Sequence, residues 1–359
     1  MSNATTTEPN TIHPPIVESH DQPRVLCFGE ALMHRINNPE ADTENKANTT
    51  DRPGGAPASV ACGVTRLGTP ASFLGRIVAD PVGQQLLALF ERRQVSTPAL
   101  QTDPQRPTRV ARLKKVPGGD LCLDDFLGDL GQGFADSAVV PATLAESVKP
   151  LLGEARWLLV STNTLVSGLS AMALDLLLKR ATAQGLGIAL DIDWCPVFWG
   201  LAPDAGPSAE VLRRFRPLGE KATLILASAE EAESFFGSAD PATLHGALAK
   251  RPAVLVTDRK GTVRWCLGGR QGTLLPAEES APSHPLGVRE AFTAALLDGL
   301  CRRPELLDAP APGGAGVAGP GPIEELLRFA SACATLVGRT EGAIEPQPGR
   351  ETVKAFLNA

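Results

Sequence analysis

Two consecutive glycines, Gly54 and Gly55, are the first residues of this chain whose type and spacing suit a ligand. Residues 54–61 read GGAPASVA. Glycine has no Cβ atom, so the pair lets the backbone approach a bound molecule closely, and Pro57 suits a first helical turn. A glycine pair before a helix is also a common turn. The pair therefore leaves both a ligand site and a simple turn open.

A second candidate for chemistry is a pair of carboxylates, Asp191 and Asp193, which directly follow the apolar run 187–190. If the chain is extended there, side chains two positions apart point to the same side of the strand end. Two such carboxylates either hold Mg²⁺ or repel phosphate, and the spacing alone does not choose between these roles.

A third candidate is the segment 287–292, which reads GVREAF and opens a predicted helix with an apolar face through residues 295–300. Glu290 is chemically competent as a general base. The guanidinium of Arg289 matches the geometry of a phosphate group, although the same side chain could equally fill the site. An ordinary charged first helical turn would have the same composition, so both interpretations stay open.

The elements that must position these residues alternate along the chain. Continuous apolar runs predict buried strands at 24–28, 71–74, 157–160, 187–190, 223–227 and 253–257, and helices are predicted at about 170–184, 208–216, 229–236 and 241–250. Ser228 and Glu231 form a predicted capping box at one helix start. The alternation predicts a layered α/β fold with ligands at the carboxyl ends of the strands.

Composition narrows the class of protein. The 359 residues are 43% hydrophobic with a net charge of −6, and no basic block offsets that charge, which argues against nucleic acid as a partner. The seven cysteines are scattered without a C-x-x-C pair, which favours reduced thiols in a cytosol-like compartment. We therefore expect a cytoplasmic protein. No stretch reaches the length of a membrane span, so no membrane association is expected.

Two segments are predicted to lie outside the core. Residues 1–23 are polar and proline-containing, and we expect a disordered tail. Residues 308–322 are almost entirely Ala, Gly and Pro, which predicts a linker loop. Residues 314–319 within it match G-x-G-x-x-G, but no strand precedes them, so the dinucleotide-binding interpretation fails its context test.

The glycine pair, its helix and the following segment to residue 77 resemble the first signature of PfkB-type carbohydrate kinases, the ribokinase-like family, in its fructokinase branch. The resemblance covers about residues 24–357. It implies a ribokinase-like layered α/β/α domain with a small β lid over the sugar, formed from about 35–55 and 107–128. It also implies transfer of a phosphoryl group from ATP, with Mg²⁺, to a sugar hydroxyl.

The resemblance assigns a catalytic role to the start of the 287–292 helix. The family reads Gly-Ala-Gly-Asp there; the helix start stabilises the phosphoryl charge and the Asp accepts the sugar proton. Gly287 then belongs to the anion site, Glu290 replaces the base and Arg289 replaces the second glycine. Glu carries its carboxylate about one C–C bond (~1.5 Å) farther out, and a displacement near 1 Å can cost on the order of 100-fold in rate.

On the sugar side, the resemblance implies contacts from Gly54, Gly55 and two altered positions. His34 stands where the family has a sugar-binding Asp, and Ser59 stands where it has Asn. A neutral imidazole cannot supply the paired acceptors of a carboxylate.

The segment 191–199 matches the fructokinase pattern Asp-x-Asn-x-Arg-x-x-x-Trp at Asp191 and Trp199. Asp193 and Cys195 replace the Asn and the Arg, so a phosphate-binding cation is lost.

On the nucleotide side, Ser228 and Glu231 match the family's (Asn or Ser)-x-x-Glu motif, whose Glu helps to organise Mg²⁺. Asp191 and Asp193 complete the predicted metal set. Thr257 and Gly261 match the Thr-x-Gly-x-x-Gly motif near the nucleotide.

These substitutions leave three functions open. One is a fructokinase-like kinase with an altered site, whose activity is weak or lost. The second is a catalytically inactive subunit with a binding or regulatory role. The third is a nucleotide or sugar sensor without turnover. The resemblance also implies a homodimer through the lid.

Overall fold

The structure is a computed structural model that describes residues 22–37, 49–115, 121–128, 133–276, 286–308 and 321–359. Within them a central sheet of nine strands has the order β13-β12-β11-β10-β9-β8-β1-β4-β5. Its strands are β1 (Val25–Phe28), β4 (Ala71–Val78), β5 (Leu100–Asp103), β8 (Trp157–Ser161), β9 (Gly187–Asp191), β10 (Leu224–Ser228), β11 (Ala253–Thr257), β12 (Val263–Leu267) and β13 (Arg270–Leu274). In this sheet order, the seven neighbouring strands β11, β10, β9, β8, β1, β4 and β5 are parallel. Strand β12 pairs antiparallel with β11, and β13 pairs antiparallel with β12.

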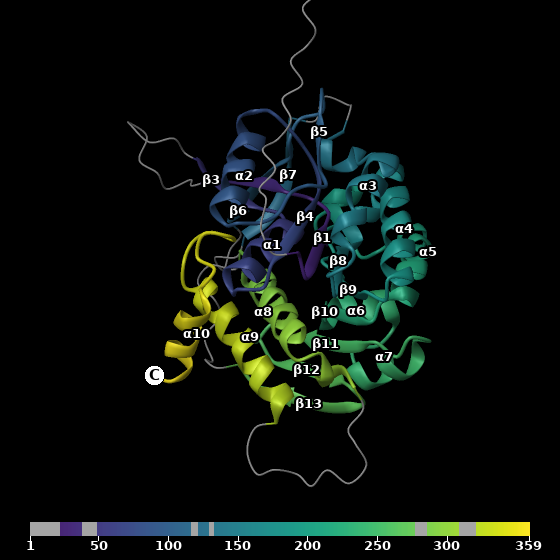
Figure 1. The fold of residues 1–359 in the computed structure, drawn as a ribbon, viewed down its shortest axis with the longest axis vertical. Helices are drawn as coiled ribbons and strands as arrows, with labels where there is room; N and C mark the ends of the chain where they lie inside the picture. The colour runs from purple at the N-terminus through teal and green to yellow at the C-terminus, as the bar shows by residue number, and fades with distance from the viewer. Residues whose placement is uncertain (1–21, 38–48, 116–120, 129–132, 277–285, 309–320) are drawn as a thin grey trace, which may run out of the picture.

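Helices cover both faces of this sheet (Figure 1). One face carries α1 (Ala56–Arg66), α2 (Pro81–Arg92), α8 (Val288–Arg302), α9 (Pro322–Gly338) and α10 (Arg350–Leu357). The other carries α3 (Pro141–Ser147), α4 (Gly168–Ala183), α5 (Ala209–Lys221), α6 (Ala229–Phe236) and α7 (Pro241–Ala247). Strand β1 shows why its residues are apolar throughout: Val25 and Cys27 enter one core, and Leu26 and Phe28 enter the other.

A second, four-stranded sheet has the order β3-β2-β6-β7, with β2 (Leu32–Asn37), β3 (Thr49–Gly54), β6 (Val110–Lys115) and β7 (Leu121–Leu127). Strands β2 and β6 are parallel, and the other pairs are antiparallel. These strands fall largely within the ranges expected for a lid, except that β2 begins three residues earlier. That this sheet covers a sugar stays a prediction.

The layered α/β/α fold expected from the sequence is confirmed. Several predicted boundaries differ: α5 continues to Lys221 rather than ending near residue 216. Of the two segments expected outside the core, residues 1–21 and 309–320 lie outside the described residues. The predicted loop 308–322 overlaps α9 at its end, because Pro322 occupies the first helical turn, where its missing N–H costs nothing. No described helix is both long and apolar enough to cross a membrane.

Candidate active site at the carboxyl edge of the sheet

The parallel strands bring several predicted site residues to one edge of the sheet. Ser228 and Thr257 are register partners at the ends of β10 and β11. Asp191 ends β9 and pairs in register with Ser161 on β8 and Leu226 on β10. Since parallel strands end at the same edge, residues far apart in the chain meet there.

Arg289 is the centre of this edge. Its Nε donates to Asp191 Oδ1 at 2.7 Å, and its Nη1 donates to Glu231 Oε2 at 2.8 Å and to Glu231 Oε1 at 3.0 Å. Nη2 also donates to Asp191. Burial alone would lower the pKa of Arg289, but the charges of Asp191 and Glu231 outweigh it and raise that pKa well above its usual value. The guanidinium is therefore a fixed cation between two carboxylates.

The carboxylate of Glu231 is fully occupied by these and two further contacts. Its Oε2 accepts from Ser228 N at 2.6 Å, and Ser228 Oγ accepts from Glu231 N at 3.0 Å. The predicted capping box is thus confirmed. The other carboxylate oxygen of Glu231, Oε1, also accepts from Trp194 N at 2.8 Å. Backbone donors and Arg289 together leave this carboxylate no free role as a metal ligand.

Asp193 lies within electrostatic range of Asp191 and Arg289, but its side-chain hydrogen bond is to neither of them. Strand β9 ends at Asp191, and Asp193 has a φ of +44°, so the chain is not extended there and the condition for a same-side arrangement is not met. Its Oδ2 accepts instead from Asn163 Nδ2 at 3.2 Å. Burial, reinforced by the charge of Asp191, raises the pKa of Asp193 well above its ordinary value. Among the described residues, no group of three or more His, Cys, Asp or Glu could hold a metal ion.

Helix α8 begins at this same edge. Gly287 is its N-cap with a φ of +82°, and a Cβ atom there would lie 2.5 Å from the carbonyl oxygen of Ala343, so only glycine fits. Glu290 is in the first turn and half-buried. Burial raises the pKa of Glu290, the charge of Asp191 adds to this, and Arg289 opposes it. The helix start therefore carries a carboxyl group that is a stronger proton acceptor than an exposed Glu.

The predicted sugar-side residues lie around β2, β3 and the start of α1. The ring of His34 packs on Gly54, where a Cβ atom would come within 2.2 Å of His34 Cε1. Burial lowers the pKa of His34 to about 4, so the ring is neutral near pH 7. Gly55 is the N-cap of α1 with a φ of +94°. Ser59 is 1% exposed, and its Oγ has no hydrogen-bond partner in the described part of the chain.

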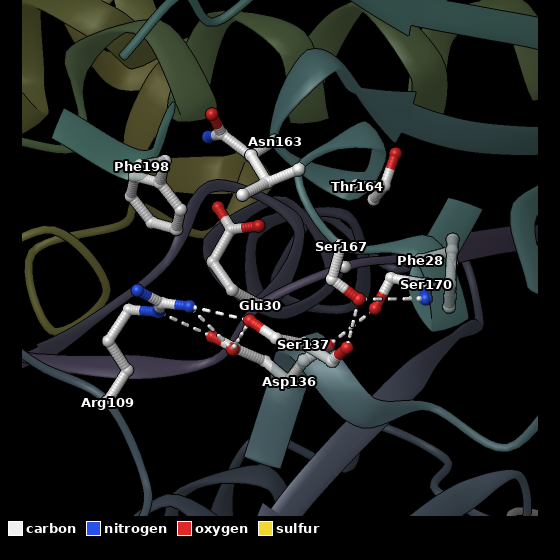
Figure 2. Close-up of a pocket in the computed structure, with 12 residues that line it drawn as sticks. Phe28, Glu30, Arg109, Asp136, Ser137, Asn163, Thr164, Ser167, Ser170 and Phe198 are labelled. Carbon is white, nitrogen blue, oxygen red and sulfur yellow. Dashed lines mark hydrogen bonds and ion pairs between the residues drawn. The ribbon is translucent and has the colours of Figure 1, made fainter. Parts of the chain in front are cut away.

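A small cavity (Figure 2) is lined in part by Glu30, Arg109, Asp136, Asn163 and Phe198. Its volume of about 20 Å³ has room for little more than one water molecule. Glu30 Oε1 accepts from Ala56 N at 3.3 Å. Burial raises the pKa of Glu30 to about 7 despite its own backbone hydrogen bond, and Asp136 adds to the rise. The cavity thus has a carboxyl group that changes charge near neutral pH.

Arg109 closes one side of this cavity. Its Nε and Nη2 donate to the two oxygens of Asp136 at 2.7 and 2.8 Å, and both side chains are only 6% exposed. The guanidinium also lies 4.2–4.5 Å from the ring centres of Phe126, Phe134 and Phe198. Sequence reasoning missed this cluster, because its members are spread over some 90 positions and no local pattern joins them.

Of the residues predicted to lie near a nucleotide, Thr257 ends β11 and Gly261 follows in a tight turn with a φ of +83°. Asp258 Oδ1 holds this turn by accepting from Lys260 N at 2.8 Å and from Thr262 N at 2.9 Å. The turn is therefore held in shape by the side chain of Asp258, directly after Thr257, the register partner of Ser228.

Comparison with known proteins agrees with this architecture. Residues 22–350 match the pfkB family of carbohydrate kinases. The chain is 24% identical to the probable fructokinase-5 of Arabidopsis thaliana, over 91% of this chain and 94% of that protein. It is also 24% identical to a fructokinase of Vibrio alginolyticus, over 93% and 99%.

Among solved structures, fructokinase of Xylella fastidiosa with bound ATP superposes with a TM-score of 0.73 at 21% identity, covering 93% of this chain and 98% of that one. The family match spans nearly the whole described chain, and the sheet order and the α8 site lie within it. The chain belongs to the pfkB family of carbohydrate kinases.

Proposed function

We propose that this protein is a fructokinase-like sugar kinase that transfers the γ-phosphoryl group of ATP to a sugar hydroxyl at a reduced rate. The observation that carries the proposal is Glu290 in the first turn of α8, beside Gly287 and at the edge where Ser228 and Thr257 meet. Its raised pKa suits a general base.

In this proposal, Glu290 accepts the proton of the sugar hydroxyl. The freed oxygen forms a bond to the γ-phosphorus, the bond from phosphorus to the bridging β-phosphate oxygen breaks, and ADP leaves with that electron pair. The N–H groups at the start of α8 face the negative charge of the phosphoryl group in transit, since a helix N-terminus favours anions.

Two differences from the family's pattern, at positions 290 and 195, are the reasons for proposing a reduced rate. Its carboxylate is carried on a longer side chain than the family's Asp, and near-1 Å displacements can cost on the order of 100-fold in rate. Cys195 supplies no cation for phosphate, and burial raises the pKa of its thiol to about 12.

The predicted Mg²⁺ site does not fit the residues in this arrangement. Arg289 binds both Asp191 and Glu231, and Asp193 is turned toward Asn163. A divalent cation between the same carboxylates would have to displace the guanidinium, so no step of the proposed reaction is assigned to Mg²⁺.

A second candidate function is an inactive subunit that binds a ligand or a protein partner. The observation that favours it is the contact of Arg289 with both Asp191 and Glu231, because the guanidinium occupies these carboxylates without nucleotide or metal. A homodimer through the second sheet also stays a prediction, which sedimentation velocity would check.

The experiment that separates these functions is ADP release from purified protein with ATP, with and without Mg²⁺, across a panel of sugars that includes fructose and ribose. Stimulation by one sugar, lost in Glu290→Gln, would support the kinase. A flat result in all conditions would favour the inactive subunit. Thermal stabilisation by ATP adds a readout independent of turnover, since a ligand at 100 times its dissociation constant contributes about 2.7 kcal/mol.

A further inference from the structure

A second and larger cavity, of about 370 Å³, lies at the opposite edge of the sheet from the candidate active site. Arg24 and Arg156, which line it, directly precede β1 and β8. Their backbones are joined, since Arg156 N donates to Arg24 O at 2.8 Å. Arg24 N in turn donates to the carbonyl oxygen of Pro70, another residue of the cavity lining, at 2.8 Å. The cavity therefore sits on the amino ends of the central parallel strands, where none of the predicted site residues lie.

Three arginine side chains line this cavity, and each has spare hydrogen-bonding capacity. Arg156 is exposed, and within the described ranges its side chain has no hydrogen-bond or ion-pair partner. Arg24 lies 3.5 Å from Glu154, and both side chains are more than 40% exposed, so this pair contributes little. Arg302 uses its Nε for Asp298 Oδ1 at 3.1 Å and has one long contact to Leu67 O.

The nearest carboxylates do not balance these cations. Asp298 is fully buried and is already bound by Arg350 and by Thr69 Oγ1, the latter at 2.7 Å. Glu154 is the one acidic side chain paired with Arg24 in the described part of the chain and is itself exposed. The cavity is thus a locally positive site on a chain whose net charge is −6.

The thiol of Cys301 shows that the three cations converge. Burial raises the pKa of Cys301 to about 12, the charge of Asp298 adds to the rise, and Arg24, Arg156 and Arg302 all oppose it. Three guanidinium groups that act on one sulfur atom lie within electrostatic range of a common point.

The helix dipole explains the position of only one of these three arginines. Arg302 is in the last turn of α8, where a cation is favoured by the helix dipole. Arg24 and Arg156 precede strands, and strand ends carry no comparable dipole. Their convergence on a cavity needs another reason.

We propose that this cavity binds a small phosphate-bearing molecule of about the size of a sugar phosphate. Guanidinium groups match the geometry of phosphate and form short, charge-assisted hydrogen bonds to it. The volume of about 370 Å³ lies in the range of small-molecule sites. Helix α8 reaches from this cavity, through Arg302, to the candidate active site, through Arg289 and Glu290, so one rigid element contacts both sites.

The test measures binding by isothermal titration calorimetry and thermal stabilisation, using inorganic phosphate, glucose 1-phosphate and, as the uncharged comparison, glucose. Ionic strength is held constant with KCl, because salt screens such interactions. The proteins are the full chain, the double variant Arg24→Gln/Arg156→Gln and the control Arg213→Gln. Arg213 is likewise an exposed arginine, but it lies on α5, away from the cavity.

We expect saturable binding of glucose 1-phosphate to the full chain and to Arg213→Gln, and at least tenfold weaker binding to the double variant. Far-ultraviolet circular dichroism checks that the double variant is folded. Equal binding by the double variant would place the phosphate elsewhere and overturn the proposal. So would the absence of binding by the full chain at 20 mM, or equal effects of glucose and glucose 1-phosphate. None of these readouts depends on kinase activity.

Discussion

Arg289 and Glu231 face each other across the candidate active site, joined by hydrogen bonds of 2.8 and 3.0 Å between the guanidinium and both carboxylate oxygens. The two residues stand in the first turns of α8 and α6. A helix start favours the anion and disfavours the cation. The cation of Arg289 is therefore stable in its position only because Glu231 and Asp191 surround it, and this pairing ties the two helix starts to the end of β9.

Replacing Arg289 by Ala should free two buried carboxylates. Because Arg289 is one-third exposed, we expect a loss of about 2–3 kcal/mol in the free energy of unfolding, below the usual cost of breaking a fully buried pair. Mg²⁺ should then stabilise this variant more than the parent protein. Urea unfolding with and without 10 mM Mg²⁺ measures both effects.

The matched control is the double variant Arg289→Ala/Glu231→Gln, because Gln still forms the capping box. It should recover part of the lost stability and should gain less from Mg²⁺. An Arg289→Ala variant as stable as the parent, with no response to Mg²⁺, would show that the cluster does not hold the site closed.

Replacing Glu290 by Gln should lower turnover at least 100-fold and leave ATP binding nearly unchanged, since Gln cannot accept the sugar proton. Glu290→Asp is the conservative partner, because it keeps the carboxylate and matches the family's residue. The pH profile of kcat/KM gives a further check. The raised pKa of Glu290 should move the rising limb of the profile above the ordinary titration of Glu. Full activity in Glu290→Gln would exclude this residue as the base.

His34 should make the protein less stable as the pH falls. Its pKa is about 4 in the folded protein, against 6.5 for an unperturbed histidine, so the unfolded chain binds more protons between these values. Stability from this group is fully present above about pH 6.5 and is lost toward pH 4, by on the order of 2–3 kcal/mol.

The check is the difference between the parent and His34→Asn in urea unfolding from pH 4 to pH 7. Glu30 and Glu290 have raised pKa values and act in the opposite direction, so only this difference isolates His34. A constant difference across the pH range would mean that His34 titrates normally.

Replacing Arg109 by Met should leave the buried carboxylate of Asp136 without a cation, and of the described side chains only Ser137 Oγ would still donate to it, at 3.1 Å. We expect a loss of about 3–5 kcal/mol in the free energy of unfolding. Arg112→Met is a matched control on β6, the strand that directly follows Arg109, because Arg112 pairs with Asp125 at the surface and both side chains are about 40% exposed. That exposed pair should contribute far less than the buried one, because water screens the two charges. Similar losses in both variants by urea unfolding would contradict the importance of burial.

The sequence predicted the layered fold because strands and helices have recognisable patterns of apolar and polar residues over short stretches. Continuous apolar runs marked β8, β9, β10 and β11 to within a residue or two, since strands buried on both faces have no polar side. The capping box at Ser228 and Glu231 was also readable, because both partners lie within one helical turn.

The sequence could not show which side chains Glu231 and Arg289 contact. Glu231 was predicted as a metal ligand, and Arg289 was left with the alternatives of binding phosphate or filling the site. Their contact joins positions 58 apart, and the contact of Arg289 with Asp191 joins positions 98 apart. No local sequence pattern indicates that Arg24, Arg156 and Arg302 line one cavity at the amino ends of the central strands.

The physical reason is that helix and strand preferences show in the pattern of nearby residues, whereas charge pairing depends on distance in space. By itself the sequence determined the strands, the helix starts and the edge at which polar residues gather. Only the tertiary structure decided that Arg289 lies between Asp191 and Glu231, and that Asp193 accepts a hydrogen bond from Asn163.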